Sequence, residues 1–215
     1  MGNIDIGFVL VSYVCLLFAL CIHEAAHAFV ADRCGDPTAR LLGRVTMNPL
    51  AHIDPIGTVV MPLLMMTTGI RFLIGWAKPV PINPLNLRNM RRDQVLVALA
   101  GPGSNLLMLI VFTLVLRTVA QMTGASSPQA LIEEPVLFIF YVLVMTNAAL
   151  LVFNLIPIPP LDGSRVLEYF LPESGRRVLA QIGPFGILII IFLVRPVIGV
   201  PLRFLSRAVI EVVFF

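Results

Sequence analysis

Four long apolar runs fix the environment in which this 215-residue chain can fold. They cover about residues 6–31, 95–116, 131–153 and 179–202, and each approaches or exceeds the roughly 20 apolar residues that cross a hydrocarbon core as a helix. Only 13% of the residues are charged, against about 25% in an ordinary soluble domain. We therefore expect an all-α polytopic membrane protein, with a single integral-membrane domain over residues 1–215.

The basic residues indicate which loops share one side of the membrane, because cytoplasmic loops carry an excess of Lys and Arg. They fall in three loops: Arg33, Arg40 and Arg44; Lys78, Arg88, Arg91 and Arg92; and Arg165, Arg176 and Arg177. The turn over residues 121–129 has none. We predict that all three basic loops are cytoplasmic.

A fifth apolar run, residues 56–75, is a poor straight helix because glycine, proline and arginine interrupt it. The loops on both sides of this run are basic, yet 20 residues are too few to cross a bilayer twice. We predict a re-entrant or hairpin membrane segment there, beside about four to five transmembrane helices. Non-helical backbone at membrane depth is tolerated only where protein or a watery cavity covers it, so this segment is expected to line a site.

Charge and targeting signals exclude some other classes of protein. The net charge of +3 comes from basic residues scattered between apolar runs, without aromatic interleaving, so topology explains them better than nucleic-acid binding. The first apolar run is not preceded by Lys or Arg, and a polar motif stands where a signal-peptide cleavage site would fall. We expect the run to be retained as a membrane helix.

That polar motif is His23-Glu24-Ala25-Ala26-His27, an HExxH pattern inside the first run. Histidines at i and i+4 lie on one helical face, where both rings reach a single ion, and the glutamate projects beside them. Polar helix packing without a metal is the alternative. It is disfavoured because ionisable groups inside a membrane span are costly and normally mark a functional site. We predict a zinc site with His23 and His27 as ligands and Glu24 as catalytic base.

A catalytic zinc ion takes three protein ligands and keeps one open position, so a third ligand is required. The candidates are Asp162, His52 and Asp54, and less plausibly Glu133, Glu134 and Glu168. Asp162 is best placed, because it follows a span that ends on the same predicted side as the HExxH helix. An Asp-Gly turn at the interface is the alternative role for this residue.

Together with HEAAH, the sequence Asn154 to Gly163, NLIPIPPLDG, resembles the site-2 protease family of intramembrane zinc metalloproteases. Three further segments are similar to that family: Gly101 to Asn105, Asn48 to Pro55, and Gly75 to Val80. The resemblance runs from the first span to the Asp-Gly pair, and it is to the small bacterial type without a PDZ domain.

The resemblance implies one zinc ion per chain, with Asp162 as the third ligand and Asn154 as an amide that lines the active site. His52 and Asn105 are weaker candidates for contact with substrate or oxyanion. For His52 an interfacial hydrogen bond is the simpler role, and for Asn105 it is close helix packing through small neighbouring residues. The expected partners are the lipid bilayer and a substrate protein with a transmembrane helix.

The function expected from these features is an intramembrane zinc metalloendopeptidase of regulated intramembrane proteolysis. It would lie in the cell (inner) membrane of a bacterium with its active site toward the cytoplasm. Two other functions fit the same residues: a membrane zinc-binding or transport protein, and a catalytically silent relative that binds helices without cutting them. The asymmetric spacing of the ligands and the intact HExxH disfavour both.

Overall fold

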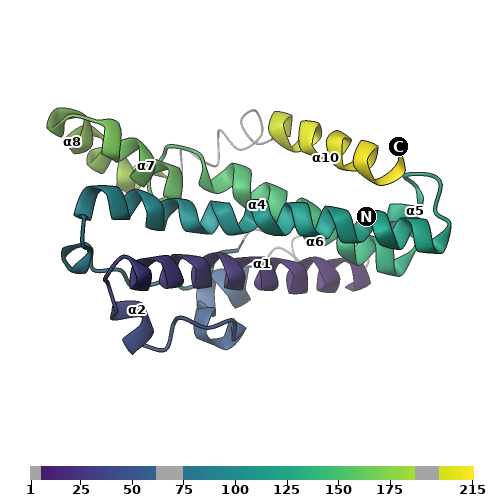
Figure 1. The fold of residues 1–215 in the computed structure, drawn as a ribbon, viewed down its shortest axis with the longest axis horizontal. Helices are drawn as coiled ribbons and strands as arrows, with labels where there is room; N and C mark the ends of the chain where they lie inside the picture. The colour runs from purple at the N-terminus through teal and green to yellow at the C-terminus, as the bar shows by residue number, and fades with distance from the viewer. Residues whose placement is uncertain (1–5, 62–74, 187–198) are drawn as a thin grey trace.

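The computed structural model describes residues 6–61, 75–186 and 199–215. Three long helices lie side by side along its long axis, with α4 antiparallel to the other two (Figure 1). They are α1 (Ile6–Arg33), α4 (Met90–Thr123) and α6 (Pro135–Asn154). No strand occurs in the described ranges, which agrees with the all-α class expected from the sequence.

Shorter helices gather at the two ends of this bundle. They are α2 (Thr38–Leu41), α5 (Ala130–Glu133), α7 (Asp162–Phe170), α8 (Glu173–Ile182) and α10 (Gly199–Phe214). Single short turns of 3-10 or π helix occupy Pro49–His52, Pro55–Val60, Pro84–Asn86 and Gly183–Phe185. The main apolar core lies where α10 packs on α4 and α6, with Leu116, Leu137 and Val144 fully enclosed.

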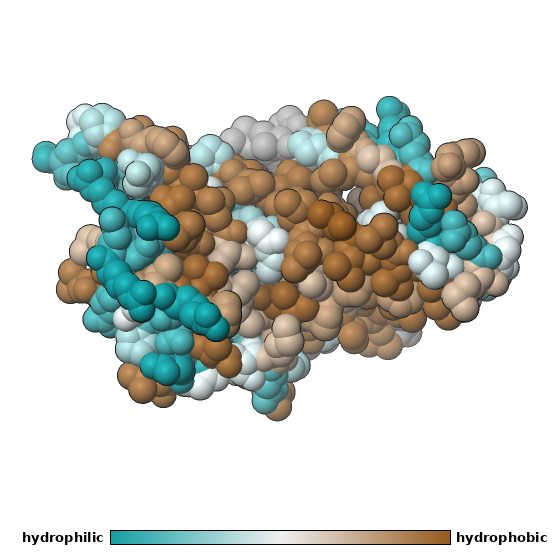
Figure 2. All heavy atoms as spheres, viewed as in Figure 1, coloured by the Kyte–Doolittle hydropathy of each residue, from teal (hydrophilic) through white to brown (hydrophobic). Residues whose placement is uncertain are grey.

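The three long helices are also apolar enough to cross a membrane, and they are the only such helices among the described residues. In the most apolar stretch of each, only 28% to 33% is buried inside the protein. Their outward faces carry exposed Leu, Val, Ile and Phe side chains, which form a brown middle zone between hydrophilic ends (Figure 2). Such a surface suits lipid contact, because an aqueous surface rarely exposes so large an apolar area.

Local sequence signals explain where α4 begins and ends. At its start, Asn89 Oδ1 accepts a hydrogen bond from Arg92 N, and Asp93 Oδ2 accepts one from Asn89 N, so two backbone donors of the first turn are satisfied. At its end, Gly124 takes the left-handed conformation with φ 70°, which glycine adopts without strain.

The basic loops meet at one end of the bundle. Arg88 N donates to Cys34 O, and the Arg44 guanidinium donates to Lys78 O, so the first two loops are joined directly. Arg91 and Arg165 line one surface hollow together with Arg176 of α8. The structure thus places the three loops together, as their shared charge predicted.

Three predicted segments differ from the structure or lie partly outside the described residues. The third predicted basic loop, with Arg165, Arg176 and Arg177, instead lies within the amphipathic helices α7 and α8. Residues 187–198 of the predicted span 179–202, and residues 62–74 of the predicted re-entrant segment 56–75, lie outside the described residues. The described ends of that segment are joined, since Trp76 N donates to Gly57 O and Thr58 Oγ1 donates to Trp76 O.

Asp36 joins the turn after α1 to the segment that leads into α4. Its buried carboxylate accepts hydrogen bonds from Thr38 N and Oγ1, from Asn83 N and from Asn86 Nδ2. Burial raises the pKa of this carboxyl group, but the hydrogen bonds outweigh that effect and hold the pKa below its ordinary value. Asp36 therefore stabilises the protein in its ionised form.

We expect Asp36→Ala to lower the free energy of unfolding by about 2 kcal/mol, because several partly buried donors lose a charged partner. For the wild type, this contribution is present above the ordinary Asp pKa of about 3.9 and is lost as the pH falls through the lowered pKa. Thermal or denaturant unfolding in detergent measures both effects. Asp32→Ala, which removes an exposed ion pair with Arg40, is the control and should cost less than about 1 kcal/mol. Equal losses in the two variants would contradict this role of Asp36.

Candidate metal centre

His23 and His27 lie one helical turn apart on the inner face of α1. Their side chains are buried, and their Nε2 atoms are 3.1 Å apart. The i, i+4 spacing alone produces this approach, because it stacks the two rings over one face of a single helix. The HExxH pattern thus forms the paired nitrogen site that the sequence predicted.

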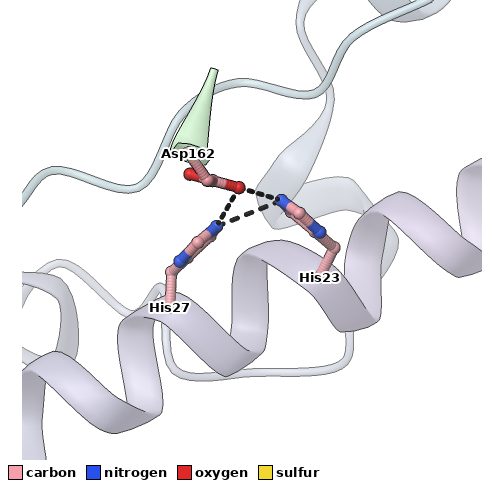
Figure 3. A group of neighbouring side chains, drawn as sticks. All are labelled: His23, His27 and Asp162. Atoms are coloured by element: carbon pink, nitrogen blue, oxygen red, sulfur yellow. Dashed lines mark hydrogen bonds and ion pairs between the residues drawn. The ribbon is translucent and has the colours of Figure 1, made fainter. Parts of the chain in front are cut away.

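Asp162 brings a carboxylate to the same point from the first turn of α7 (Figure 3). Its Oδ2 lies 3.2 Å from His23 Nε2 and 3.3 Å from His27 Nε2. The chain leaves α6 after Asn154 and turns back over residues 155–161. Gly163 permits this return, since a Cβ there would lie 2.6 Å from the Leu155 carbonyl carbon.

Two observations indicate that these three side chains could bind a metal ion: the chemistry of their ligand atoms, and a buried oxygen that has no hydrogen-bond partner. Asp162 Oδ2 is buried and has no hydrogen-bond partner, which is costly unless a cation compensates it. The ligand atoms of the three residues all lie within 4.8 Å of one another, and no other group of this kind occurs among the described residues. Two imidazole nitrogens and one carboxylate oxygen are a known donor set of catalytic zinc sites.

The second nitrogen of each histidine is held by a neighbour on α4. His27 Nδ1 is 2.7 Å from Val97 O, and His23 Nδ1 is 2.7 Å from Asn105 Oδ1. A carbonyl oxygen can only accept a hydrogen bond, so each Nδ1 carries the proton. The Nε2 lone pair of both rings is therefore available to a metal, as in other histidine metal sites with an oriented outer partner.

Gly101 of α4 makes room for the two rings. A Cβ at this position would lie 2.5 Å from His23 Cε1 and 2.6 Å from His23 Nε2, and it would also meet His27 Nε2. Real Cβ atoms essentially never come closer than 3.0 Å to such neighbours. Glycine here lets the backbone of α4 pass directly over the site.

We expect Gly101→Ala to lower the zinc affinity by about 100-fold or more, since the metal-binding nitrogens would have to move. Gly103→Ala is a matched control on the same helix, because no atom lies within 4 Å of a Cβ at that position. Both changes raise helix propensity by up to about 1 kcal/mol, so the two variants differ mainly in whether the added methyl group meets the histidines. Competition with a zinc chelator measures the affinities; equal values for the two variants would contradict this role of Gly101.

Glu24 lies beside the histidines and is held by a single main-chain donor. Its Oε2 accepts a hydrogen bond of 2.9 Å from Val80 N. Pro79 and Pro81 flank Val80 and favour extended backbone there. The segment is anchored near this contact, because Lys78 N donates to His52 O and Val80 packs on Ala28 and Ala39.

The weaker predicted site residues lie in different surroundings in the structure. Buried His52 contacts Thr46 O through Nε2, at 2.9 Å, and Asn154 Nδ2 donates to Leu150 O in its own helix. Asn105 is fully buried behind His23, where it contacts a ligand histidine. Contact of any of these three residues with substrate stays a prediction.

Three partners of the site were not predicted from the sequence. Val97 O and Val80 N are backbone atoms, which every sequence offers at almost every position. Asn147 of α6, whose Oδ1 accepts from Asn105 Nδ2, did carry a signal. A side-chain amide in the middle of an apolar span is unusual enough to mark a position of interest.

Comparison with known proteins gives a consistent set of relatives. Residues 11–194 match the model of Peptidase family M50. The chain is 35% identical over 182 residues to YwhC of Bacillus subtilis, which covers 84% of this chain and 78% of that protein. It is 31% identical to Rip2 of Mycolicibacterium smegmatis and to Rip2 of Mycobacterium tuberculosis. These two alignments cover 82% of this chain but only 63% of each relative, so the chain spans less than two thirds of their length. All three relatives carry the names of predicted zinc metalloproteases, and no solved structure matches significantly.

Proposed function

This chain belongs to peptidase family M50, the site-2 protease family, and on that premise we propose that it cleaves membrane-protein substrates in or near their transmembrane segments. The protein is accordingly a zinc metalloprotease. The observation that carries the proposal is the cluster of His23, His27 and Asp162, which lies among apolar helices with Glu24 beside it. A partly buried carboxylate and two buried imidazoles in such surroundings are hard to explain by packing alone.

His23, His27 and Asp162 are the residues that would hold the zinc ion. When bound, zinc polarises the scissile carbonyl and lowers the pKa of a water molecule to about 7. The two Nδ1 contacts, to Asn105 and Val97, keep the ligand nitrogens aimed at one point.

Glu24 acts as the general base in this proposal. Its carboxylate takes a proton from the attacking water and then delivers that proton to the leaving amide nitrogen. The hydrogen bond from Val80 N fixes one carboxylate oxygen, so the other can face the reacting atoms. Asn154, at the end of α6, would donate to the substrate or to the developing oxyanion.

A transmembrane substrate must be locally unwound, because a helix hides its amides in internal hydrogen bonds. We propose that the segment over residues 56–75, whose residues 62–74 lie outside the described part of the chain, presents a backbone edge to the unwound chain, as in strand addition. Crosslinking of a bound substrate is expected near its described ends, Gly57 and Trp76. Crosslinks found only on other faces of the protein would contradict this part of the proposal.

The proposed location is a bacterial cell membrane, with the metal centre on the cytoplasmic side. The basic loops at that end of the bundle support this orientation, since their Arg and Lys residues favour the cytoplasm. An alkaline phosphatase reporter inserted in the turn at Ser126 should be active, whereas one inserted after Arg177 should be inactive. The reverse pattern would overturn the orientation.

The substrate class can be tested without knowing a substrate in advance. We would compare membrane proteomes of cells that carry the wild type or Glu24→Gln. Full-length proteins with transmembrane helices should accumulate with the variant, and their cleavage products should appear only with the wild type. Accumulation restricted to soluble proteins would refute the proposed substrate class.

A further inference from the structure

A chain of buried amides connects α6 to the metal centre. Asn147 Nδ2 donates to Leu143 O at 2.9 Å, and Asn105 Nδ2 donates to Asn147 Oδ1 at 3.0 Å. Asn105 Oδ1 then faces His23 Nδ1 at 2.7 Å. Both asparagine side chains are 0% exposed. Buried amides are costly inside apolar helices, so this chain of contacts is an expensive feature of the bundle.

The direction of every hydrogen bond in this chain follows from its far end. Leu143 O is a backbone carbonyl and can only accept, so the Asn147 atom that faces it must be the NH2 group. The oxygen of Asn147 therefore faces Asn105 and requires an NH2 donor there. That orientation turns the oxygen of Asn105 toward His23, where it requires a proton on Nδ1.

His23 and His27 differ in the kind of group that keeps the proton of the neutral ring on Nδ1. The acceptor for His27 is Val97 O, a helix carbonyl that cannot rotate. The acceptor for His23 is a side-chain amide, whose oxygen and NH2 ends are nearly equal in size. If Asn105 rotated by half a turn, its NH2 would face Nδ1, and the proton of the ring would move to Nε2. The ring would then present no lone pair to a metal.

We propose that Asn147 is a positioning residue of the metal centre, which prevents this rotation. Through Asn105 it holds His23 in the tautomer whose Nε2 can bind a metal ion. The inference rests on the proposed function only in taking His23 as a zinc ligand. It assigns a role to a residue of α6, a helix that supplies none of the three ligands.

The test separates positioning from packing with two variants at one position. Asn147→Leu has a similar side-chain volume but no polar atoms. The Asn105 side chain then loses its hydrogen-bond acceptor on α6 and is free to rotate. Asn147→Asp keeps an oxygen toward Asn105 Nδ2, but its second oxygen faces Leu143 O, which destabilises the fold. Thr113→Val is the control, because the Thr113 hydroxyl is buried on α4 and bonds only Leu109 O in its own helix.

We would measure zinc affinity by chelator competition and the thermal unfolding of the metal-free protein, both for the purified chain in detergent. Asn147→Leu should bind zinc about 10-fold to 100-fold more weakly, as for other changes around a metal-binding histidine. Asn147→Asp should bind zinc within about threefold of the wild type although it unfolds at a lower temperature, and Thr113→Val should bind normally.

Two results would overturn the inference. One is wild-type zinc affinity in Asn147→Leu. The other is an affinity that falls with thermal stability across all the variants, which would mark Asn147 as a packing residue. A wild-type protein that bound no zinc would instead refute the proposed function, so the two failures are distinguishable.

Discussion

Glu24→Gln is expected to bind zinc like the wild type and to cleave its substrate about 10²-fold to 10⁴-fold more slowly. The glutamine oxygen can still accept the hydrogen bond from Val80 N, so the local structure should persist. What is lost is a carboxylate that can take a proton from water and return it to the leaving amine. Zinc content and single-turnover cleavage of a transmembrane substrate in lipid vesicles would measure the two effects separately.

Asp32→Asn is the matched control for this prediction. Asp32 lies two turns further along α1 and pairs with Arg40 on the surface, so the same chemical change should leave cleavage unaltered. Cleavage by Glu24→Gln at the wild-type rate would refute the role of Glu24 as general base. Loss of zinc from that variant would show that Glu24 supports the metal centre itself.

Asp162→Ala is expected to lose the metal as well as the activity. It removes the only oxygen ligand of the cluster and leaves two imidazoles, fewer than the three protein ligands of a catalytic zinc site. The zinc content after dialysis should fall from one ion per chain to below about 0.1. Elemental analysis of the purified protein would measure this ratio.

Glu168→Ala is the matched control, because Glu168 lies on the same helix α7, is exposed, and was itself a weaker candidate from the sequence. This variant should keep one zinc ion per chain. A normal zinc content in Asp162→Ala, or a loss of zinc in Glu168→Ala, would exclude the ligand set described above.

The parts of the site that were predictable from the sequence depend on local spacing or on topology. His23 and His27 are four residues apart on one helix, so their approach needs no knowledge of the fold. Asp162 is far away along the chain, and two arguments favoured it over the other candidates: the basic loops indicated that its span and the HExxH helix end on the same side, and the family resemblance implies an aspartate ligand there. The long apolar helices were predictable because composition and length suffice to identify them.

The features that the sequence did not disclose have other physical causes. The helices α7 and α8 are short and amphipathic, so a search for long apolar runs does not detect them, and their arginines were assigned to a basic loop. The acceptor Val97 O and the donor Val80 N have no signature in the sequence, since backbone groups look alike at every position. Gly101 resembles a helix-packing glycine until the structure shows which side chains pass over it.

The hydrogen bond from Val80 N to Glu24 has a consequence for mutational scanning. No side-chain substitution except proline can delete a main-chain donor, and Val80 supplies the only N–H between Pro79 and Pro81. Alanine scanning at this position would therefore report only on the packing of the valine against Ala28 and Ala39. A residue that orients the proposed catalytic base would then look dispensable in such a screen, because the contribution comes from its backbone N–H and not from its side chain.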